Sequence, residues 1–478
     1  LFITFLLPFN TLAQLPGNVK GYEYWFKSNE NQDSINKNEN SLNFRSTKKI
    51  DYKNFFENIK STKIQGEVTV FLVINPSFEQ KSSVITDIVT DERIISIQSN
   101  KIESKRDLNI NKYKSNKPFI LSYIESIQPD STLFNNSSIN NNRFEGDIAE
   151  VILFPKLLSK RNRRKIETYL SLKHGISLEL ESDYINSTGD TIWKANKNEY
   201  FPNRLTGIGL DYNSNFNNLQ SSNSDLYQFL TINFEDKSIN NQLNNHEEIN
   251  YFLWSDNDGD IKFNNVEEDV LILDRIWLTK KIGDFNENNI SIKYNLDFVD
   301  ENTSETNDKE QNNDNEKEYW LIISKDNGPE IDFRSSNFID IGKKEANSVI
   351  FQGVSLSEFN NYSKFTIAKA PELFAILQNS MKENCETDIK FKIIGGKAPY
   401  SISLYDSNNV EHQLETINNS EYLLVNPKVN DYTYYIEDSV GNKFKKNFRI
   451  GTEFKDSILI PNIFISKNQI KTFSITDF

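Results

Sequence analysis

The apolar and polar positions from residue 15 to about residue 142 alternate in short runs, and turns rich in Asn, Ser and Lys separate these runs. Strict alternation is typical of half-buried strands, and a continuous apolar run bounded by turn residues is typical of a buried strand. The clearest strand is predicted at 67–74, and others at 119–124 and 146–154. This part of the chain is therefore predicted to be an all-β domain.

One helix is predicted directly after the last of these strands. Ser159 is a good N-cap, apolar residues recur at helical spacing over 161–173, and Gly175 suits a left-handed C-cap. His174 lies at the negative end of the helix dipole, so it is predicted to be a helix-end residue and not a ligand. The basic cluster at 160–165 favours a solvated helix face over a site for an anionic partner.

Strands with turns between them recur from 178 to 370, which predicts a second β domain. A strongly acidic segment at 300–318 lies between predicted strands at 290–299 and 319–323, and it is predicted to be a disordered hairpin insertion. Large aromatic residues are spaced through the region as predicted core residues: Trp193, Tyr200, Trp254, Trp277 and Trp320.

A third unit is predicted at 371–451, with the size and strand spacing of an immunoglobulin-like sandwich. Its predicted strands are 389–394, 400–405, 422–425 and 432–437. The fold class predicted for the chain is thus all-β, with sandwiches in tandem and one helix.

Composition excludes several functional classes. The 478 residues carry 54 Lys and Arg against 68 Asp and Glu, a net charge of −14, which disfavours a nucleic-acid partner. The single Cys385 forms no internal disulfide and no thiolate zinc site. Three widely spaced histidines leave little for acid–base or metal chemistry, so the composition favours a protein that is not an enzyme.

The first residues predict export. An apolar run at 1–12 is too short to span a bilayer, and Ala13 ends a small-x-small pattern that suits cleavage. We therefore expect a signal peptide at 1–13 that lacks its basic n-region and its Met; the alternative is a buried N-terminal strand. Since no other run reaches about 18 apolar residues, no transmembrane segment is predicted.

Residues 144–178 contain Gly146, Ile148, Ala149, Glu150 and Val151, followed by Tyr169, Leu170, Lys173, Gly175 and Ile176. This pattern resembles the closing strand and helix of concanavalin/laminin-G-like jelly rolls in surface proteins of gliding and biofilm bacteria with type IX secretion. The segments 15–17 and 24–27 are similar to the first strand of that family. The resemblance implies a jelly roll at 15–178 with one closing helix.

The remaining regions extend the resemblance. The region 179–370 is similar to the uncharacterised β domain that often follows these jelly rolls, on motifs such as Thr191-Ile192-Trp193. The unit at 371–451 resembles the small repeats of gliding-motility adhesins. Residues 452–478 are expected to be a linker and a truncated type IX sorting element.

This resemblance implies an exported, non-catalytic protein, secreted or on the outer cell surface. Adhesion or glycan binding through the jelly roll is the preferred function, with a polysaccharide or cell-surface glycan and the type IX secretion machinery as expected partners. The alternatives are a ligand-free structural spacer or surface filament component, and a polysaccharide hydrolase.

The best candidate for a metal site is formed by Asp256, Asp258 and Asp260, which are spaced around a glycine turn. Alternating carboxylates offer hard oxygen ligands to Ca²⁺, and Glu267 falls at the last ligand position of an EF-hand loop counted from Asp256. The glycine position of that loop is Ile261, however, and a tight hairpin turn explains the same residues equally well. Calcium binding and a structural turn both remain open.

Glu330 and Asp332 are the candidate carboxylates of a hydrolase. On a strand their spacing places both on one face, as paired acid–base chemistry requires. The third carboxylate of laminarinase-type jelly rolls is missing, which disfavours this route. The aromatic residues at 22–26 are predicted to pack in a core, with stacking on sugar rings as the alternative.

Overall fold

The structure is a computed structural model, and the chain divides into two compact units, 1–370 and 371–478, each considered by itself below. The structure describes the following residues, some of them by their backbone alone: 15–28, 41–49, 66–76, 84–90, 93–98, 102–104, 117–127, 132–135, 146–224, 228–236, 249–267, 269–284, 288–299, 317–326, 328–381, 387–425, 430–450, 463–466 and 469–472. The predicted signal peptide 1–13, Cys385, His246 and nearly all of the acidic segment 300–318 lie outside these residues.

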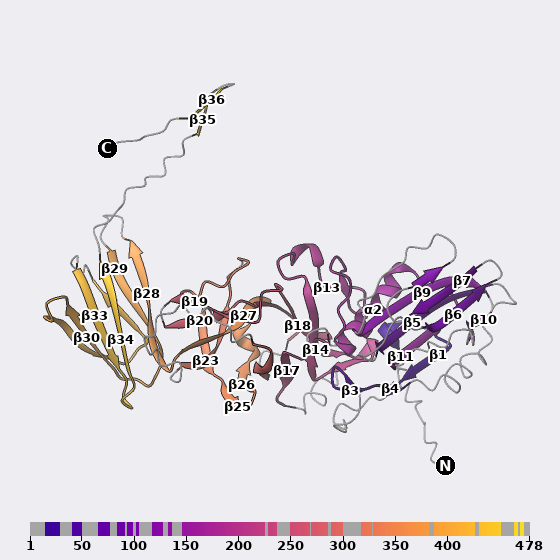
Figure 1. The fold of residues 1–478 in the computed structure, drawn as a ribbon, viewed down its shortest axis with the longest axis horizontal. Helices are drawn as coiled ribbons and strands as arrows, with labels where there is room; N and C mark the ends of the chain where they lie inside the picture. The colour runs from indigo at the N-terminus through magenta and orange to yellow at the C-terminus, as the bar shows by residue number, and fades with distance from the viewer. Residues whose placement is uncertain are drawn as a thin grey trace, which may run out of the picture. The chain divides into compact units, whose positions relative to one another are not determined.

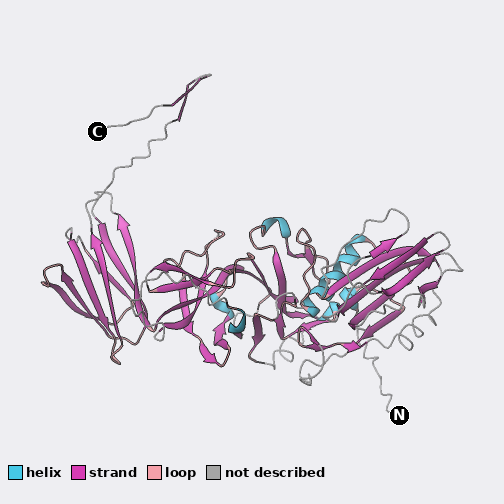
Figure 2. Ribbon diagram, in the orientation of Figure 1, coloured by secondary structure: helices cyan, strands magenta, loops and turns pink. Residues whose placement is uncertain are grey.

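The described residues form antiparallel sheets and a single α-helix, α2 (Lys160–His174), which confirms the all-β class with sandwiches in tandem (Figure 2). The first sheet has the order β1-β11-β5-β9, with β4 paired to β11. Its strands are β1 (Tyr24–Lys27), β4 (Lys48–Lys49), β5 (Gly66–Pro76), β9 (Phe119–Ile127) and β11 (Gly146–Phe154). These bounds confirm the strands predicted at 67–74, 119–124 and 146–154.

A four-stranded sheet and a short hairpin complete the N-terminal part. The sheet has the order β10-β6-β7-β8, and the hairpin pairs β2 with β3. The bounds are β2 (Ser41–Leu42), β3 (Arg45–Ser46), β6 (Val84–Thr90), β7 (Arg93–Gln98), β8 (Ile102–Ser104) and β10 (Thr132–Asn135).

The second sandwich pairs a nine-stranded sheet with a five-stranded sheet of order β16-β17-β22-β26-β25. In the larger sheet the path is β15-β14-β18-β21-β27-β20-β19, and β23 joins β27 to β24. Its strands are β14 (Asn203–Asp211), β15 (Phe216–Asn218), β18 (Ile249–Asp256), β19 (Phe263–Glu267), β20 (Val270–Leu273), β21 (Trp277–Ile282), β23 (Lys317–Ser324), β24 (Asn337–Ile341) and β27 (Tyr362–Pro371). Those of the smaller sheet are β16 (Gln220–Ser222), β17 (Leu230–Phe234), β22 (Asn289–Asn295), β25 (Lys343–Glu345) and β26 (Ser348–Ser355).

Short elements connect these sheets: η1 (Pro16–Asn18), β12 (Tyr184–Ile185), β13 (Thr191–Trp193), η2 (Ala195–Lys197), η3 (Tyr212–Ser214), η4 (Leu296–Phe298) and η6 (Leu356–Glu358). The strand predicted at 290–299 is shorter than expected. It ends at Asn295, whose side chain accepts a hydrogen bond from the Asp297 amide at 3.1 Å and so begins the turn η4.

The helix α2 confirms its predicted signals. The Ser159 hydroxyl accepts a hydrogen bond from the Asn162 amide at 3.3 Å, and Gly175 has a φ of 64°. A Cβ atom on Gly175 would approach the Ser222 carbonyl oxygen to 2.3 Å, so both the backbone conformation and the space require glycine. Among the described residues, no helix is long and apolar enough to cross a membrane.

The helix lies between the first sheet and the nine-stranded sheet of the second sandwich, and its buried residues form one hydrophobic cluster with residues of both sheets (Figure 1). On one side, its buried residues pack against Phe71 and Ile152 of the first sheet. On the other side, they pack against Tyr251 and Leu253 of β18. Since successive strand residues point to opposite faces, Phe252 and Trp254 of the same strand face the core of the second sandwich. The predicted border at 178 and 179 is therefore crossed by a continuous hydrophobic core.

The core of the second sandwich contains many of its large aromatic residues. Trp254 and Trp277 are buried in it, and Trp277 stacks on Phe229 and Phe365. Trp193 and Trp320 are buried as well. Tyr200 was expected to be a core residue, and this expectation is wrong: its side chain is 61% exposed.

The second unit is a smaller sandwich of a three-stranded sheet, β28-β29-β32, and a four-stranded sheet, β31-β30-β33-β34. Its strands are β28 (Leu373–Met381), β29 (Thr387–Gly395), β30 (Tyr400–Asp406), β31 (Glu411–Ile417), β32 (Glu421–Leu424), β33 (Asn430–Glu437) and β34 (Lys443–Ile450). The strands predicted at 389–394, 400–405, 422–425 and 432–437 are confirmed, with bounds that differ by at most two residues. A further hairpin pairs β35 (Ile463–Ser466) with β36 (Gln469–Thr472).

Candidate functional site

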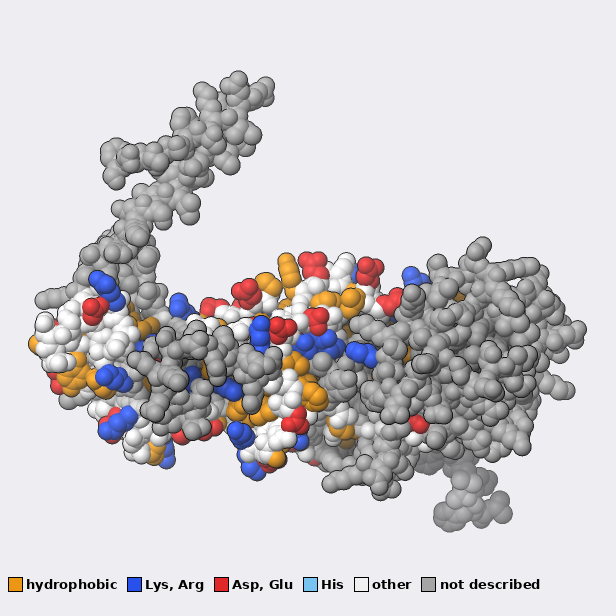
Figure 3. All heavy atoms as spheres, in the orientation of Figure 1, with side chains coloured by type: hydrophobic (Ala, Val, Ile, Leu, Met, Phe, Trp, Pro, Cys, Tyr) orange, Lys and Arg blue, Asp and Glu red, His pale blue; other side chains and the backbone are white. Residues whose placement is uncertain are grey.

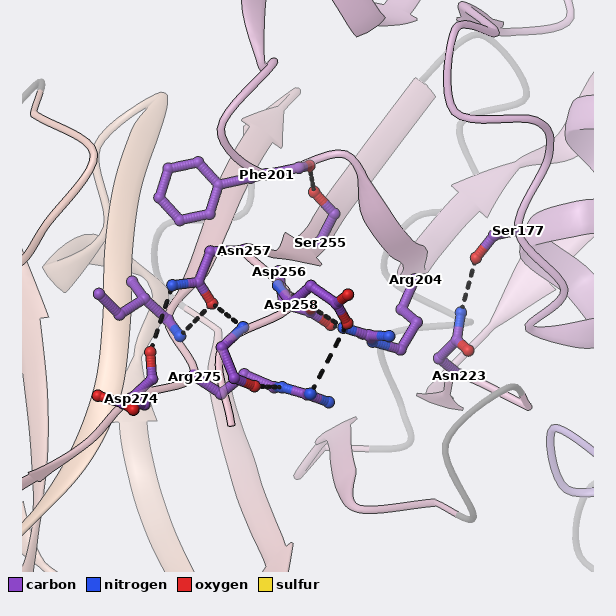
Figure 4. A network of polar contacts seen from close by, with 12 residues as sticks. Ser177, Phe201, Arg204, Asn223, Ser255, Asp256, Asn257, Asp258, Asp274 and Arg275 are labelled. Atoms are coloured by element: carbon purple, nitrogen blue, oxygen red, sulfur yellow. Dashed lines mark hydrogen bonds and ion pairs between the residues drawn. The ribbon is translucent and has the colours of Figure 1, made fainter. Parts of the chain in front are cut away.

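The carboxylates predicted to bind calcium lie in a turn at the end of β18, where arginines surround them (Figure 4). The guanidinium of Arg204, on β14, donates from Nε to Asp256 Oδ2 at 2.7 Å and from Nη2 to both Asp256 and Asp258. Arg275 Nη2 lies 3.8 Å from Asp258 Oδ1. Asp260 is not part of this group and pairs instead with Lys262 at 3.0 Å.

The turn itself is fixed by the amide of Asn257. Its oxygen accepts hydrogen bonds from the backbone amides of Gly259 and Ile276, both at 3.0 Å, and its nitrogen donates to the Asp274 carbonyl at 3.3 Å (Figure 4). Burial alone would lower the pKa of Arg204, but its bonds to the two aspartates outweigh this effect and raise that pKa. The ion pairs therefore keep Arg204 charged.

Each of the three carboxylates is thus paired with a Lys or Arg side chain of the same chain. In the part of the chain that the structure describes, no group of three or more His, Cys, Asp or Glu side chains lies close enough to hold a metal ion. The structure thus brings Asp256 and Asp258 together but not Asp260, and it favours a structural turn for these residues. Calcium binding stays a prediction.

Glu330 and Asp332 do not lie on a strand, so the premise of the hydrolase hypothesis is wrong. They belong to an exposed turn between β23 and β24 that begins at Gly328 and Pro329. Asp332 accepts a hydrogen bond from the Arg334 amide at 3.1 Å, which fixes the turn. The chain leaves the sheet at Ser324, where β23 ends and where the Ser324 hydroxyl accepts a hydrogen bond from the Asp326 amide at 3.4 Å.

A second charged cluster surrounds Glu150, and its members include residues of the jelly-roll pattern. Glu150 lies on β11 with its side chain fully buried. Its Oε1 accepts hydrogen bonds from Trp25 Nε1 at 2.7 Å and from the Tyr169 hydroxyl at 2.9 Å. Its Oε2 accepts from Lys173 Nζ at 2.8 Å and lies 2.9 Å from His174 Nε2. One carboxylate thereby ties two strands to the C-terminal turn of α2.

Burial and charge set the protonation of this cluster. Burial alone would raise the pKa of Glu150, but the charge of Lys173 and the hydrogen bond from His174 outweigh it and hold the pKa well below its usual range. Burial lowers the pKa of His174 to about 4, against the opposing effect of Glu150. At neutral pH the cluster is therefore a carboxylate and an ammonium beside a neutral imidazole.

These groups are closed to a substrate. His174 is 2% exposed, and Glu150 is 1% exposed. Trp25 is half-buried and packs edge-on against Tyr22 and Tyr169, so it has the predicted role of a packing residue. The shifted pKa of His174 thus follows from its place inside the scaffold, between the first sheet and the second sandwich.

A third set of contacts centres on Asn43, which sequence reasoning missed. Its Nδ2 donates to the carbonyls of Leu172 and Lys173 at 3.3 and 3.1 Å and to Ser221 Oγ at 3.0 Å. Its Oδ1 accepts from the Ser222 amide at 2.8 Å. Asn43 therefore satisfies carbonyls that the end of α2 leaves open and links them to β16. No local signal reveals this role, because Asn43 and Ser221 are 178 residues apart.

The basic cluster at 160–165 is largely occupied by contacts inside the chain. Arg161 donates to the Thr188 carbonyl at 3.1 Å, Lys165 donates to the Ser187 carbonyl at 2.5 Å, and Arg164 pairs with Glu167 at 3.4 Å. On the face of the molecule seen in Figure 3, blue Lys and Arg side chains are interspersed with red Asp and Glu side chains. The prediction was a solvated helix face, and Arg161 and Lys165 depart from it, because each donates to a backbone carbonyl of residues 187–188.

The fold and the clusters described above define an all-β protein of fused sandwiches. Its buried charged side chains pair with one another and connect elements of the fold. Residues 162–363 match the family described as "Domain of unknown function (DUF8202)". No curated protein matches the chain.

Solved structures of two bacterial enzymes are similar over part of the chain. A Ruminococcus gnavus beta-glucuronidase in complex with uronic isofagomine is 10% identical, with a TM-score of 0.15, over 34% of this chain and 34% of that chain. A Parabacteroides merdae beta-glucuronidase with glycerol in its active site is 12% identical, with a TM-score of 0.14, over 34% of this chain and 27% of that chain. The chain thus covers about a third of these enzymes, and TM-scores this low support no inference about function.

Proposed function

We propose that the chain is a non-catalytic binding protein, which adheres to a surface or binds a glycan through the predicted jelly roll at 15–178. The observation that carries the proposal is that the charged and polar residues of the jelly-roll pattern are buried in the scaffold. Glu150, Tyr169 and Lys173 are enclosed between a sheet and a helix, where they hold the scaffold together and meet no substrate.

The shared core adds mechanical support to this proposal. Because α2 packs against both sandwiches, a load on one is transmitted through side-chain contacts to the other. A protein that holds a surface-bound ligand under load benefits from such a joint. We also propose, from the apolar run at 1–12 and the resemblance, that the protein is exported to the outer cell surface or the medium.

A glycan array probed with the full chain tests the binding function, with and without a chelator. We expect saturable binding to at least one glycan, and equal binding in both conditions if calcium has no part in it. Binding to no glycan in either condition would contradict the glycan version and leave the ligand-free spacer as the better account. Small-angle scattering of the same sample then tests that spacer, which requires a stable elongated particle.

A further inference from the structure

A polar groove with a volume of about 650 Å³ lies on the outer face of the five-stranded sheet of the second sandwich. This face is set by strand alternation. Ile232 of β17 and Ile292 of β22 are fully buried in the core, while their neighbours point outward. The outward positions that line the groove carry amides and hydroxyls: Gln220, Thr231, Asn233, Ser291, Asn295 and Gln352.

The amides and hydroxyls form a row across neighbouring strands. Gln220 of β16 is the register partner of Asn233 on β17, and Asn233 is the register partner of Ser291 on β22. An amide or hydroxyl side chain carries both donor and acceptor groups, and the nitrogen of Asn233 also donates to the Phe234 carbonyl at 3.2 Å. Such a row matches a ligand whose groups also donate and accept, which is the property of sugar hydroxyls.

The charges at the groove do not favour an ionic ligand. Lys293 is the cation of the lining, and Asp297 and Glu345 are its anions. Glu345 is also paired with Lys343 at 2.9 Å. With Glu345 paired to Lys343, Lys293 and Asp297 balance each other, so the lining suits a neutral ligand.

One wall of the groove is Phe44, from the turn of the β2–β3 hairpin in the N-terminal part. Asn43 and Phe44 have φ values of 48° and 63°, the left-handed conformation of a tight hairpin turn in which glycine is usual at the second position. A bulky residue there costs backbone energy. The five hydrogen-bond contacts of Asn43 hold the turn in place, so that Phe44 stays at the groove.

We propose that this groove binds a neutral oligosaccharide. The Phe44 ring packs against the apolar C–H face of one sugar ring, and the amide row bonds the hydroxyls of the neighbouring rings. An apolar platform beside a few placed polar groups is the usual composition of a small-molecule site. The site is separate from the jelly-roll surface proposed above, because all its lining residues except Phe44 belong to 179–370.

Isothermal titration calorimetry of the full chain tests the proposal with cellohexaose, laminarihexaose, xylohexaose and mannohexaose as neutral probes and hexagalacturonate as the anionic probe. We expect one neutral probe to bind saturably. Its affinity falls at least about tenfold in Phe44→Gly and in Gln352→Ala. Two matched exposed variants outside the groove, Tyr200→Ala and Asn418→Ala, retain the full affinity.

Each other outcome overturns a defined part of the account. Unchanged affinity in both groove variants would move the binding site elsewhere and overturn this inference, while the proposed glycan binding would stand. Tighter binding of hexagalacturonate than of every neutral probe would overturn the neutral ligand. Binding of none of the probes would overturn the groove, and with a negative array it would overturn the proposed function as well.

Discussion

The chain has two carboxylate clusters that differ in where they lie and in how deeply their partner cations are buried. Asp256 and Asp258 stood out in the sequence because acidic residues alternate around a glycine. The structure places them at the end of a strand, where the Asp256 side chain is 2% exposed and the Asp258 side chain is 61% exposed. Glu150 lies within an apolar run and attracted no chemical hypothesis of its own. Its side chain is fully buried, and its partners Lys173 and His174 have side chains that are 7% and 2% exposed.

The difference teaches that the surroundings of the paired cation, and not the density of acidic residues, decide what a charged cluster contributes. Lys173, which is 7% exposed, loses its carboxylate when Glu150 is replaced, whereas Arg204, which is 17% exposed, keeps Asp258 and access to water when Asp256 is replaced. The comparison therefore orders the expected effects of mutation, from the Glu150 cluster down to the aspartate turn.

The largest effect is expected for Glu150→Gln. This change removes the charge that compensates Lys173 inside the core, so we expect the free energy of unfolding to fall by about 3–5 kcal/mol. Urea unfolding followed by tryptophan fluorescence measures it. Glu167→Gln is the matched control, because its pair with Arg164 is at the surface, and it costs less than about 0.5 kcal/mol. Equal costs for the two variants would contradict the structural role of Glu150.

Acid is expected to weaken the same cluster. The pKa of His174 is about 4 in the folded chain and 6.5 as its ordinary value, so between these values the unfolded chain binds a proton that the folded chain does not. The contribution of His174 to the free energy of unfolding therefore has its full value above pH 6.5. It falls as the pH is lowered from 6.5 to 4, by on the order of 3 kcal/mol in total. Below that range Glu150, whose pKa is also lowered, adds a loss of the same sign.

Urea unfolding at several pH values measures this dependence. The slope of unfolding free energy against pH between 6.5 and 4 is expected to be smaller in His174→Gln than in the unchanged chain. An identical slope in both proteins would show that His174 does not titrate as its burial requires.

A smaller effect is expected for Asp256→Asn. Arg204 loses one charged partner but keeps Asp258, so the free energy of unfolding should fall by about 1–3 kcal/mol. Asp260→Asn is the control, because Asp260 is exposed and pairs with the exposed Lys262, and it should change stability by less than about 0.5 kcal/mol. A loss in Asp256→Asn as large as that in Glu150→Gln would break the comparison.

Phe44→Gly is expected to leave stability unchanged or to raise it by up to about 1 kcal/mol, because glycine adopts the left-handed conformation without strain. Asn43→Ala at the adjacent position removes the bonds to α2 and β16, and it should lower the free energy of unfolding instead. Thermal unfolding of both variants tests this contrast. A clear loss of stability in Phe44→Gly would assign Phe44 to packing.

The smallest effect is expected from calcium. Since Arg204 and Arg275 together already balance the charges of Asp256 and Asp258, millimolar Ca²⁺ should leave the midpoint of thermal unfolding where a chelator leaves it. A rise of several degrees with Ca²⁺ that disappears in Asp258→Asn would restore the calcium site.

Local signals predicted much of the fold. The caps of α2 and the strands of both sandwiches follow from residues close in sequence, such as Ser159, Gly175 and the apolar run at 146–154. The main local error is the segment around Glu330, because β23 ends at Ser324, before the carboxylates are reached.

The functional contacts were not predictable in the same way, because they join distant parts of the chain. Trp25 and Glu150 are 125 residues apart, and the bonds of Asn43 reach β16. The packing of α2 against two sheets was not predictable for the same reason. An amphipathic pattern shows that a helix has an apolar face, but not that two separate sheets cover it.

Native-state hydrogen exchange of the full chain, read by mass spectrometry, tests most directly the central claim that the two N-terminal parts form one body around α2. The measurement compares the amides of β11 with those of β18 in the unchanged chain and in Glu150→Gln. If the parts unfold together, the mutation lowers protection in both strands by the same amount. Loss of protection in β11 with β18 unchanged would contradict the claim.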